Sequence, residues 1–435
     1  MKVRWDWERC LEVDVADKRG INMLGRSKPQ CLSDISAPQQ RWRREMKLPK
    51  IVLVGSSLGL VAAACGSSSS TSSSTTAAPA TPGVTASSIL FGQTVPKSGP
   101  AALYGQQTQG IQAYFDTINA QGGVGGRKLK LISLDDQYSP PVSLQDTKTL
   151  IEQDHVFAIV QTNGTATTEA NMPIYQQFGV PVVGAGTGAA YFYDTLRPFF
   201  FNIWPAYTVE GQKLGQFAVQ NLKLNKIGVI YQNDDFGKSL YQGFQNSGAK
   251  AAVAIPYDPT QTDFSSAVAQ LKSAGVDGVV VFAIPGPAIS IMNAMAAINF
   301  HPKLLLSQVS VAPSSYSAVN SSEIDGSYIS AFIPPLTDST NPQVAAFRSA
   351  MQKYEPGTPA SVFAAWGWEA AQTAVAGLKA TKGPLTRASY IAGLNTLSNL
   401  AILGGTISYS PTDHAGLKNV TVLENVNGHR VAPTG

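Results

Sequence analysis

From Ile89 onward, short apolar runs alternate with segments in which apolar residues recur every three or four positions. The short runs are rich in β-branched residues, which is typical of strands. The helical segments carry one apolar face, as with Ile111, Tyr114, Phe115 and Ile118. Eight strands are predicted: Ile89–Val95, Lys128–Asp135, Phe157–Val160, Val180–Gly184, Lys226–Tyr231, Gly278–Phe282, Lys303–Ser307 and Gly326–Ile333.

This alternation predicts an α/β fold. Near-continuous apolar strands joined by one-sided helices indicate parallel sheets that are covered on both faces. The pattern runs to about Asn202, restarts at Lys226, and gives way to consecutive helical patterns between Asn341 and Leu397. A short β-like end begins at Gly405. We therefore expect two doubly wound, Rossmann-like lobes, with the chain crossing between them more than once.

A different hydrophobic segment precedes this region. Lys47 and Lys50 are followed by an apolar run of 14 residues, 51–64, which ends in three alanines before Cys65. The run is too short for a membrane span, which needs about 20 residues, but it suits the apolar part of a signal peptide. It resembles a bacterial lipoprotein signal, which implies lipidation of Cys65. The alternative is a buried helix that ends in a free cysteine.

The signal divides the chain into segments. Residues 1–45 are expected to be an untranslated or disordered extension, because Met46 directly precedes the basic start of the signal at 46–64. Residues 65–87 are rich in Ser and Thr and are predicted to be a flexible tether. The remaining residues, about 350, exceed the size of one typical core, so two domains are expected.

Charge and cysteine content change once residues 1–64 are set aside. The whole chain has 32 basic and 28 acidic residues, but 12 of the basic and seven of the acidic residues lie before Cys65. The rest is nearly neutral, with 20 basic against 21 acidic residues, so nucleic-acid binding is disfavoured. Cys10 and Cys31 also lie in this part, so no disulfide is expected after cleavage.

Specific residues resemble a known family. Gly99-Pro-Ala-Ala-Leu-Tyr-Gly105, followed by Ile118-Asn-Ala-Gln-Gly-Gly-Val124, is similar to the opening of the leucine/isoleucine/valine-type periplasmic binding proteins. Asp135 and Asp136 follow at the usual place. The resemblance covers roughly Ile89 to the C-terminus.

The resemblance implies a type I solute-binding protein whose two lobes close on a ligand about a three-strand hinge. By comparison, lobe 1 comprises residues 88–204 and 334–403, and lobe 2 residues 205–333 and 404–435. Such a protein hands its solute to the permease of an ABC importer at the outer face of the cytoplasmic membrane, and needs no cofactor. A sensor of the same fold that feeds a membrane signalling protein is the alternative.

Candidate ligand-binding residues in lobe 1 follow predicted strands, where open α/β sheets bind ligands. The loop 161–165 opens a helix whose free N–H groups suit an anion, and the resemblance implies that this loop binds the ligand carboxylate. A plain N-cap is the alternative. Tyr104 is expected to cover the ligand, unless it only packs on the following helix. The candidates are Tyr104, Asn163, Gly164, Thr165, Ala185, Gly186 and Thr187.

Lobe 2 departs from the amino-acid-binding pattern. Phe236 stands where the family often has a tyrosine, and Gln308 aligns with the acidic residue that neutralises the ligand ammonium. An amide compensates poorly for the desolvation of an ammonium, so an α-amino acid is expected only if Asp234 or Asp235 substitutes. Aromatic acids and amides remain open. Ile284 and Phe363 are expected to add apolar walls.

Residue patterns typical of catalytic or metal sites are sparse in this sequence. The four histidines (His155, His301, His414 and His429) lack metal-ligand spacing, and no Gly-x-Ser-x-Gly motif occurs. Residues 184–188 superficially match a dinucleotide loop, but they lie outside the first strand–helix unit and lack an acidic residue about 20 positions later. We predict that the chain is not an enzyme. A secreted Rossmann-type enzyme is the rival interpretation.

Overall fold

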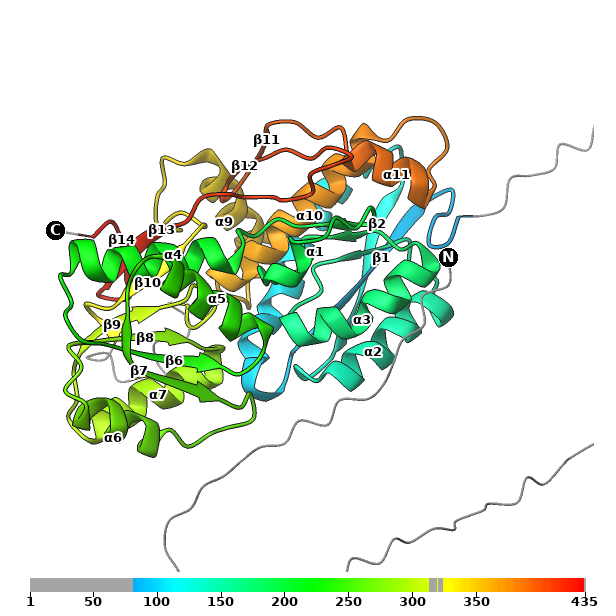
Figure 1. Ribbon diagram of the computed structural model, residues 1–435. Coiled ribbons are helices and arrows are strands. Elements are labelled where there is room, and N and C mark those ends of the chain that lie inside the picture. Colours follow the sequence, from blue (N-terminus) through cyan, green and yellow to red (C-terminus); the bar gives the residue numbers. More distant parts are fainter. Residues whose placement is uncertain (1–80, 313–318, 320–323, 434–435) are drawn as a thin grey trace, which may run out of the picture. The chain divides into compact units, whose positions relative to one another are not determined.

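The computed structural model describes residues 81–312, 319 and 324–433, and Figure 1 shows their arrangement. Two sheets organise this part of the chain. The first contains strands from the N-terminal half only, whereas the second collects strands from the middle and from the C-terminal end (Figure 1). The predicted α/β class with two doubly wound lobes is confirmed by this topology and by the similar solved structures described below.

The first sheet has five parallel strands in the order β2-β1-β3-β4-β5. The longest pair joins β1 to β2 over eight residues, from Ser88 opposite Lys128 to Val95 opposite Asp135. The strands are β1 (Ser88–Val95), β2 (Lys128–Asp135), β3 (Ala158–Val160), β4 (Val182–Val183) and β5 (Phe200–Phe201).

Helices from both ends of the chain pack around this sheet. α10 lies along α1, and α2 lies beside α3 (Figure 1). The helical elements are η1 (Gly99–Gly105), α1 (Gln106–Ala120), α2 (Pro140–Lys148), η2 (Thr149–Gln153), α3 (Thr165–Phe178), η3 (Ala190–Phe192), α9 (Pro342–Tyr354), α10 (Val362–Ala380) and α11 (Arg387–Leu394).

The second sheet has seven strands in the order β14-β13-β10-β9-β8-β6-β7. Its five parallel strands repeat the order of the first sheet, while β13 and β14 add antiparallel pairs. The strands are β6 (Ile227–Gln232), β7 (Ala251–Tyr257), β8 (Gly278–Phe282), β9 (Lys303–Leu306), β10 (Tyr328–Ala331), β13 (Thr421–Val426) and β14 (His429–Val431). The helical elements are α4 (Tyr207–Gln216), η4 (Phe217–Asn221), α5 (Asp235–Asn246), α6 (Ser265–Ser273) and α7 (Pro285–Ala297).

Each of the eight predicted strands overlaps an observed one. The prediction omitted the two-residue strand β5 and also β7, an edge strand whose exposed and half-buried residues alternate and which contains Pro256. A proline is tolerated at a sheet edge because it removes a backbone donor that has no neighbour there. Three of the seven residues of β7 are alanine and one is proline, and both residue types are depleted in strands, so the segment lacks the β-branched character by which the other strands were predicted.

The chain passes between the two sheets three times, and two of the passages are hydrogen-bonded to each other. The amide of Asn202 donates to the carbonyl of His414 (3.0 Å), and that of Leu417 donates to the carbonyl of Ile203 (2.8 Å). The separate hairpin of β11 (Leu400–Ile402) and β12 (Gly405–Ile407) spans the boundary expected between residues 403 and 404. The lobe limits expected from the sequence stay a prediction. The third passage pairs with the first at residues 414–417, about ten residues after Gly404.

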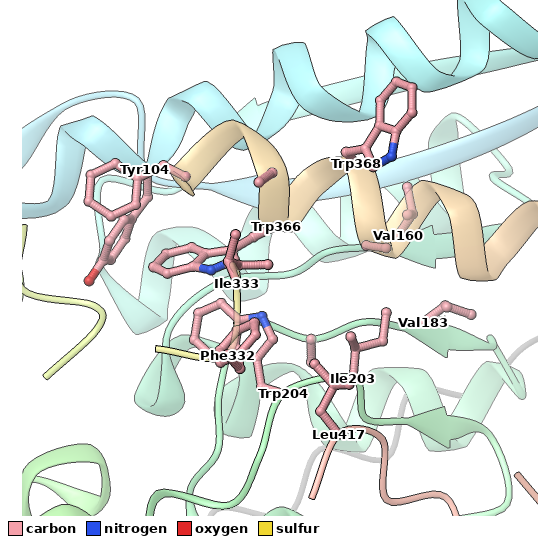
Figure 2. Packing of buried hydrophobic residues seen from close by; sticks show 14 of the residues in the cluster. Tyr104, Val160, Val183, Ile203, Trp204, Phe332, Ile333, Trp366, Trp368 and Leu417 are labelled. Atoms are coloured by element: carbon pink, nitrogen blue, oxygen red, sulfur yellow. The ribbon is translucent and has the colours of Figure 1, made fainter. Parts of the chain in front are cut away.

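A cluster of large aromatic rings lies where these passages meet α10. Trp366 packs on Trp204 with ring centroids 4.5 Å apart, and Phe332 stacks near both (Figure 2). Trp368 points to the opposite side of α10, where its ring meets that of Tyr114 at 4.8 Å. Both α10 tryptophans are buried, as expected for core residues.

Candidate functional site

The carboxyl ends of strands from both sheets surround a small cavity. Its volume of about 10 Å³ is enough for roughly one water molecule. Its walls come from loops after strands, from the first passage between the sheets, and from the starts of helices, as open α/β sheets lead one to expect. The lining residues are Tyr104, Tyr138, Asn163, Gly164, Thr165, Gly186, Trp204, Tyr207, Phe236, Ile284 and Val309.

One end of the cavity is the N-terminus of α3. Gly164 precedes this helix with a φ of +93°, a conformation that favours glycine, and no side chain caps the helix. A Cβ atom at Gly164 would lie 2.6 Å from the Thr167 hydroxyl oxygen and 2.8 Å from the Tyr138 ring. The first backbone N–H groups of a 14-residue helix therefore adjoin the cavity, with the positive end of the helix dipole behind them.

A pair of hydroxyl groups adds polarity at this end. The Oγ1 atoms of Thr165 and Thr187 are 2.8 Å apart, and Thr187 Oγ1 also accepts from the amide of Ala189 (3.2 Å). Thr165 lines the cavity, whereas Thr187 lies behind it. When Thr187 donates to Thr165, the hydroxyl hydrogen of Thr165 is left to donate to a group in the cavity.

Asn163 is packed against Gly186 on the neighbouring loop. Any side chain at Gly186 would collide with Asn163, since a Cβ atom would lie 2.4 Å from its Nδ2 atom. The Asn163 Nδ2 atom donates to Gln107 Oε1 at 3.2 Å, while its buried Oδ1 atom has no partner among the described residues. This carbonyl oxygen is thus a free acceptor in a residue that lines the cavity.

Aromatic rings form most of the remaining wall. Tyr104 stands edge-on to Phe363, with ring centroids 5.3 Å apart, and lies near Trp366 (Figure 2). Tyr207 stands edge-on to Phe236, also at 5.3 Å. Burial raises the pKa of Tyr104 and of Tyr207 well above the usual range, so both phenols stay neutral.

Tyr138 reaches the cavity from a tight turn after β2. Gln137 and Tyr138 both have positive φ angles, of 55° and 61°. Asp135 Oδ1 accepts from the amide of Gln137 (3.1 Å), and Asp136 Oδ1 accepts from that of Tyr138 (2.9 Å). Burial raises the pKa of Asp136 to about 7. The adjacent aspartates therefore serve to shape the turn.

Three contacts close the cavity between elements of the two sheets. The Tyr104 hydroxyl donates to the carbonyl of Val309 at 2.8 Å. Gln232 Nε2 is 3.4 Å from the Tyr138 hydroxyl. At the third contact, α7 approaches η1 so closely that a Cβ atom on Gly286 would lie 2.7 Å from the Pro100 carbonyl oxygen. The molecule is therefore in a closed arrangement.

No charged side chain lines this cavity among the described residues. Two acidic residues that could offset an ammonium, Glu210 and Asp234, are hydrogen-bonded elsewhere, and Asp235 is exposed. Glu210 is fully buried and accepts from Ser307 Oγ (2.6 Å), Ser330 Oγ (2.7 Å) and the Gln308 amide (3.2 Å). Burial raises the pKa of Glu210, although those hydrogen bonds act to lower it. Asp234 caps α5 by accepting from the amide of Gly237 (3.2 Å).

The periplasmic binding protein family matches residues 88–430 of the chain. The chain belongs to this family. Its members are ligand-binding proteins, so the predictions of this family and of a non-enzymatic protein are confirmed. The Rossmann-type enzyme is excluded on that ground. The glycines of the 184–188 loop also have a packing reason, because a Cβ atom on Gly184 would meet Ala370 and Ile203, both at 2.7 Å.

Two curated relatives match part of the chain. An amino acid binding protein of Pseudomonas aeruginosa is 24% identical over 198 residues, which are 44% of this chain and 53% of that protein. A Leu/Ile/Val-binding protein homolog of Brucella melitensis is 27% identical over 201 residues, 44% of this chain and 54% of that protein. The match therefore spans about half the length of these relatives.

Solved structures are similar over most of the chain. A possible leucine/isoleucine/valine-binding protein from Rhodopirellula baltica has a TM-score of 0.74 and 25% identity, covering 80% of this chain and 97% of its own. A solute-binding protein from R. palustris, solved with benzoate, has a TM-score of 0.70 and 24% identity, covering 79% and 95%. A branched-chain amino acid binding protein from Streptococcus pneumoniae, solved with isoleucine, has a TM-score of 0.69 and 20% identity, covering 79% and 97%.

The cavity of this binding protein brings together many of the residues suggested by the sequence. The candidates that line it are Tyr104, Asn163, Gly164, Thr165, Gly186, Phe236 and Ile284. Ala185 and Thr187 are buried behind the wall, and Phe363 supports Tyr104 from α10. The Gln308 side chain donates to Glu210 Oε2 at 3.3 Å and does not line the cavity. The role of each residue in binding stays a prediction.

Four lining residues were not suggested by the sequence: Tyr138, Trp204, Tyr207 and Val309. Tyr138 follows the aspartate pair after β2, and Val309 follows Gln308 after β9. Their positions directly after strands could have identified both as candidate ligand-binding residues. Trp204 and Tyr207 flank Pro205 in the first passage between the sheets, where no strand rule applies. Their place in the wall depends on how the two sheets meet.

The described residues bear on two further expectations. Within the ranges given above, no helix is long and apolar enough to cross a membrane. Within the same ranges, no group of three or more His, Cys, Asp or Glu side chains is placed to hold a metal ion. Cys65 and the expected segments 1–45 and 46–64 lie outside the described residues, as does most of the tether 65–87.

Proposed function

We propose that this periplasmic binding protein captures a small organic carboxylate with an apolar, preferably aromatic, body. The observation that carries the proposal is the lining of the cavity: aromatic walls, no charged side chain among the described residues, and one polar end at the uncapped start of α3. A carboxylate at that end gains from the N–H groups, the helix dipole and the Thr165 hydroxyl.

The walls favour an aromatic acid over the other solutes suggested by the sequence. The ammonium of a branched-chain amino acid has no carboxylate partner on the cavity wall, because Glu210 and Asp234 are hydrogen-bonded elsewhere. Leaving such a cation unpaired costs several kcal/mol, roughly. An amide has no charge for the helix dipole to stabilise. The free acceptor on Asn163 suits a hydroxyl or amino substituent of the ligand.

Similar proteins support this range of ligands. The R. palustris protein was solved with benzoate, and a protein from Thermomonospora curvata is described as the substrate-binding protein of a fatty acid ABC transporter. The S. pneumoniae protein was solved with isoleucine. The fold therefore accommodates carboxylates with and without an ammonium group, and the wall of this cavity favours those without.

Capture requires the two lobes to separate and close again. The cavity holds about one water molecule in the closed arrangement, so a solute enters only when the contacts of Tyr104 with Val309 and of Pro100 with Gly286 are broken. We propose that the ligand makes room by moving side chains of the cavity wall, and that the contacts of Tyr104 with Val309 and of Pro100 with Gly286 form again around it.

We further propose that the protein is tethered to the outer face of the cytoplasmic membrane by a lipid on Cys65 and delivers its solute to the permease of an ABC importer. The family, the signal-like segment 46–64 and the Ser/Thr-rich stretch after Cys65 support this assignment. Deleting the gene should reduce uptake of the labelled solute by whole cells. Unchanged uptake would contradict the importer role.

Thermal unfolding of the chain against a panel of solutes tests the ligand class. The panel contains benzoate, benzamide, L-leucine and L-valine. A ligand at 100 times its dissociation constant adds about 2.7 kcal/mol to stability and raises the midpoint by several degrees. Benzoate should raise the midpoint and the amino acids should not. A shift with leucine and none with benzoate would refute the proposed class.

A further inference from the structure

A second groove lies on the chain passage that leads from β10 to α9. It is lined by Pro334, Pro335, Leu336, Thr337, Arg348, Pro359, Ala360, Ser361, Val362, Gly428, His429 and Arg430. Its volume is about 400 Å³, within the range of roughly 300–1,000 Å³ that is typical of small-molecule sites. None of its residues lines the cavity at the start of α3.

The groove combines apolar walls with basic side chains. Three prolines, Leu336 and Val362 supply rigid apolar walls. Arg348, His429 and Arg430 are its ionisable residues, and no acidic residue lines it. Arg430 is largely buried, and its guanidinium donates to the carbonyl of Val311. Arg348 is exposed on α9.

We propose that this groove is a second ligand site, for an organic anion with an apolar body. The prolines and aliphatic side chains bury the body of the ligand, and Arg348 pairs with its acidic group. Guanidinium groups bind carboxylate and sulfonate oxygens with two parallel hydrogen bonds, so they suit such a ligand. The proposal does not depend on which solute occupies the first cavity.

The position of the groove couples it to the closure of the lobes. Arg348 and Val362 belong to α9 and α10, which pack with α1 around the first sheet, and Ala360 lies in the loop between them. His429 and Arg430 belong to β14 of the second sheet. Pro334 to Thr337 connect the two sheets. The distance between the opposite walls therefore changes when the sheets move relative to each other. A ligand that fits the groove in the closed arrangement stabilises that arrangement.

The test uses 1-anilinonaphthalene-8-sulfonate, an organic anion that fluoresces when it leaves water, with the full chain carrying Cys65→Ser. We expect saturable binding of the dye, with one site in this groove. Arg348→Glu should weaken it at least tenfold, and Ala360→Trp should do the same by filling the groove. The matched control is Lys353→Glu, which makes the same charge change on α9 outside the groove and should leave binding unchanged.

The results separate the site from nonspecific adsorption. No saturable binding, binding that ignores both groove variants, or equal weakening by Lys353→Glu overturns the site. Coupling is tested with Gly286→Val, which lies outside the groove and obstructs closure at Pro100. We expect this variant to weaken dye binding severalfold. Unchanged binding in Gly286→Val would overturn the coupling to lobe closure.

Discussion

Replacing Gly286 with valine should weaken ligand binding while leaving the fold intact. Gly286 is the second residue of α7 and does not line the cavity. In the closed arrangement a Cβ atom here would lie 2.7 Å from the Pro100 carbonyl oxygen, about 0.7 Å short of ordinary contact at 3.4 Å. Valine adds two methyl groups beyond that atom. The lobes must therefore stay further apart at this edge of the cleft.

The expected loss follows from this geometry. A displacement of 0.7 Å takes the 2.8 Å hydrogen bond between Tyr104 and Val309 to the 3.5 Å limit of such bonds. Overpacking typically costs about 1–3 kcal/mol, and here the cost falls on the closed form alone. The dissociation constant should then rise roughly 5- to 150-fold. Gly286→Ala should give a smaller rise. The unfolding midpoint should fall little, because the lobes can stay slightly apart and relieve the overlap without unfolding.

Calorimetric titration with benzoate measures the effect. Gly357→Val is the matched control, since a Cβ atom at Gly357 meets nothing within 4 Å and this residue lies far along the chain from the cleft loops. Equal affinity in wild type, Gly286→Val and Gly357→Val would refute the reasoning that binding requires closure at Pro100.

Three further predictions concern other parts of the molecule. Thr165→Val should weaken benzoate binding by about 1–3 kcal/mol, because it removes a hydroxyl donor to a charged group, whereas Thr165→Ser should retain affinity; calorimetry with both variants decides. Cys65→Ser should move the protein from the membrane fraction to the soluble fraction, and continued retention would contradict the lipid anchor. Burial raises the pKa of Glu369 to about 8, against 4.5 for an ordinary glutamate. Its protonated form therefore stabilises the fold fully below pH 4.5, and this stability declines as the pH rises and is lost above pH 8. Glu369→Gln should remove that decline from unfolding midpoints measured between pH 4.5 and 9, and parallel curves for the two proteins would contradict it.

The periodicity of the sequence predicts the architecture well, for a physical reason. Buried parallel strands such as β8 must be apolar on both faces, so they stand out as continuous runs. The edge strand β7 escaped notice because three of its seven residues are alanine and one is proline, which are depleted in strands. The passages between the sheets were less predictable, since the pairing of Ile203 with Leu417 depends on tertiary contacts between residues far apart in the sequence.

The residues of the cleft likewise divide into those that the sequence could predict and those that it could not. Loops after strands could be located from sequence, which is why the start of α3 and Tyr104 were found. Within a loop, a single residue decides which side chain lines the cavity. Val309 lines it, while the preceding Gln308 donates to the buried Glu210. Glu210 lies on α4, about a hundred positions before Gln308, so no local pattern could reveal this partner.

Calorimetric titration with benzoate, benzamide and L-leucine tests the central claim most directly. Benzoate and benzamide have nearly the same size and shape, so their difference isolates the carboxylate at the start of α3. A hydrogen bond to a charged group contributes about 1.5–3 kcal/mol, so benzoate should bind roughly 10- to 150-fold more tightly than benzamide. Leucine should bind more weakly than benzoate, because its ammonium finds no carboxylate on the cavity wall. Tight binding of leucine with none of benzoate, or equal binding of benzoate and benzamide, would contradict the account.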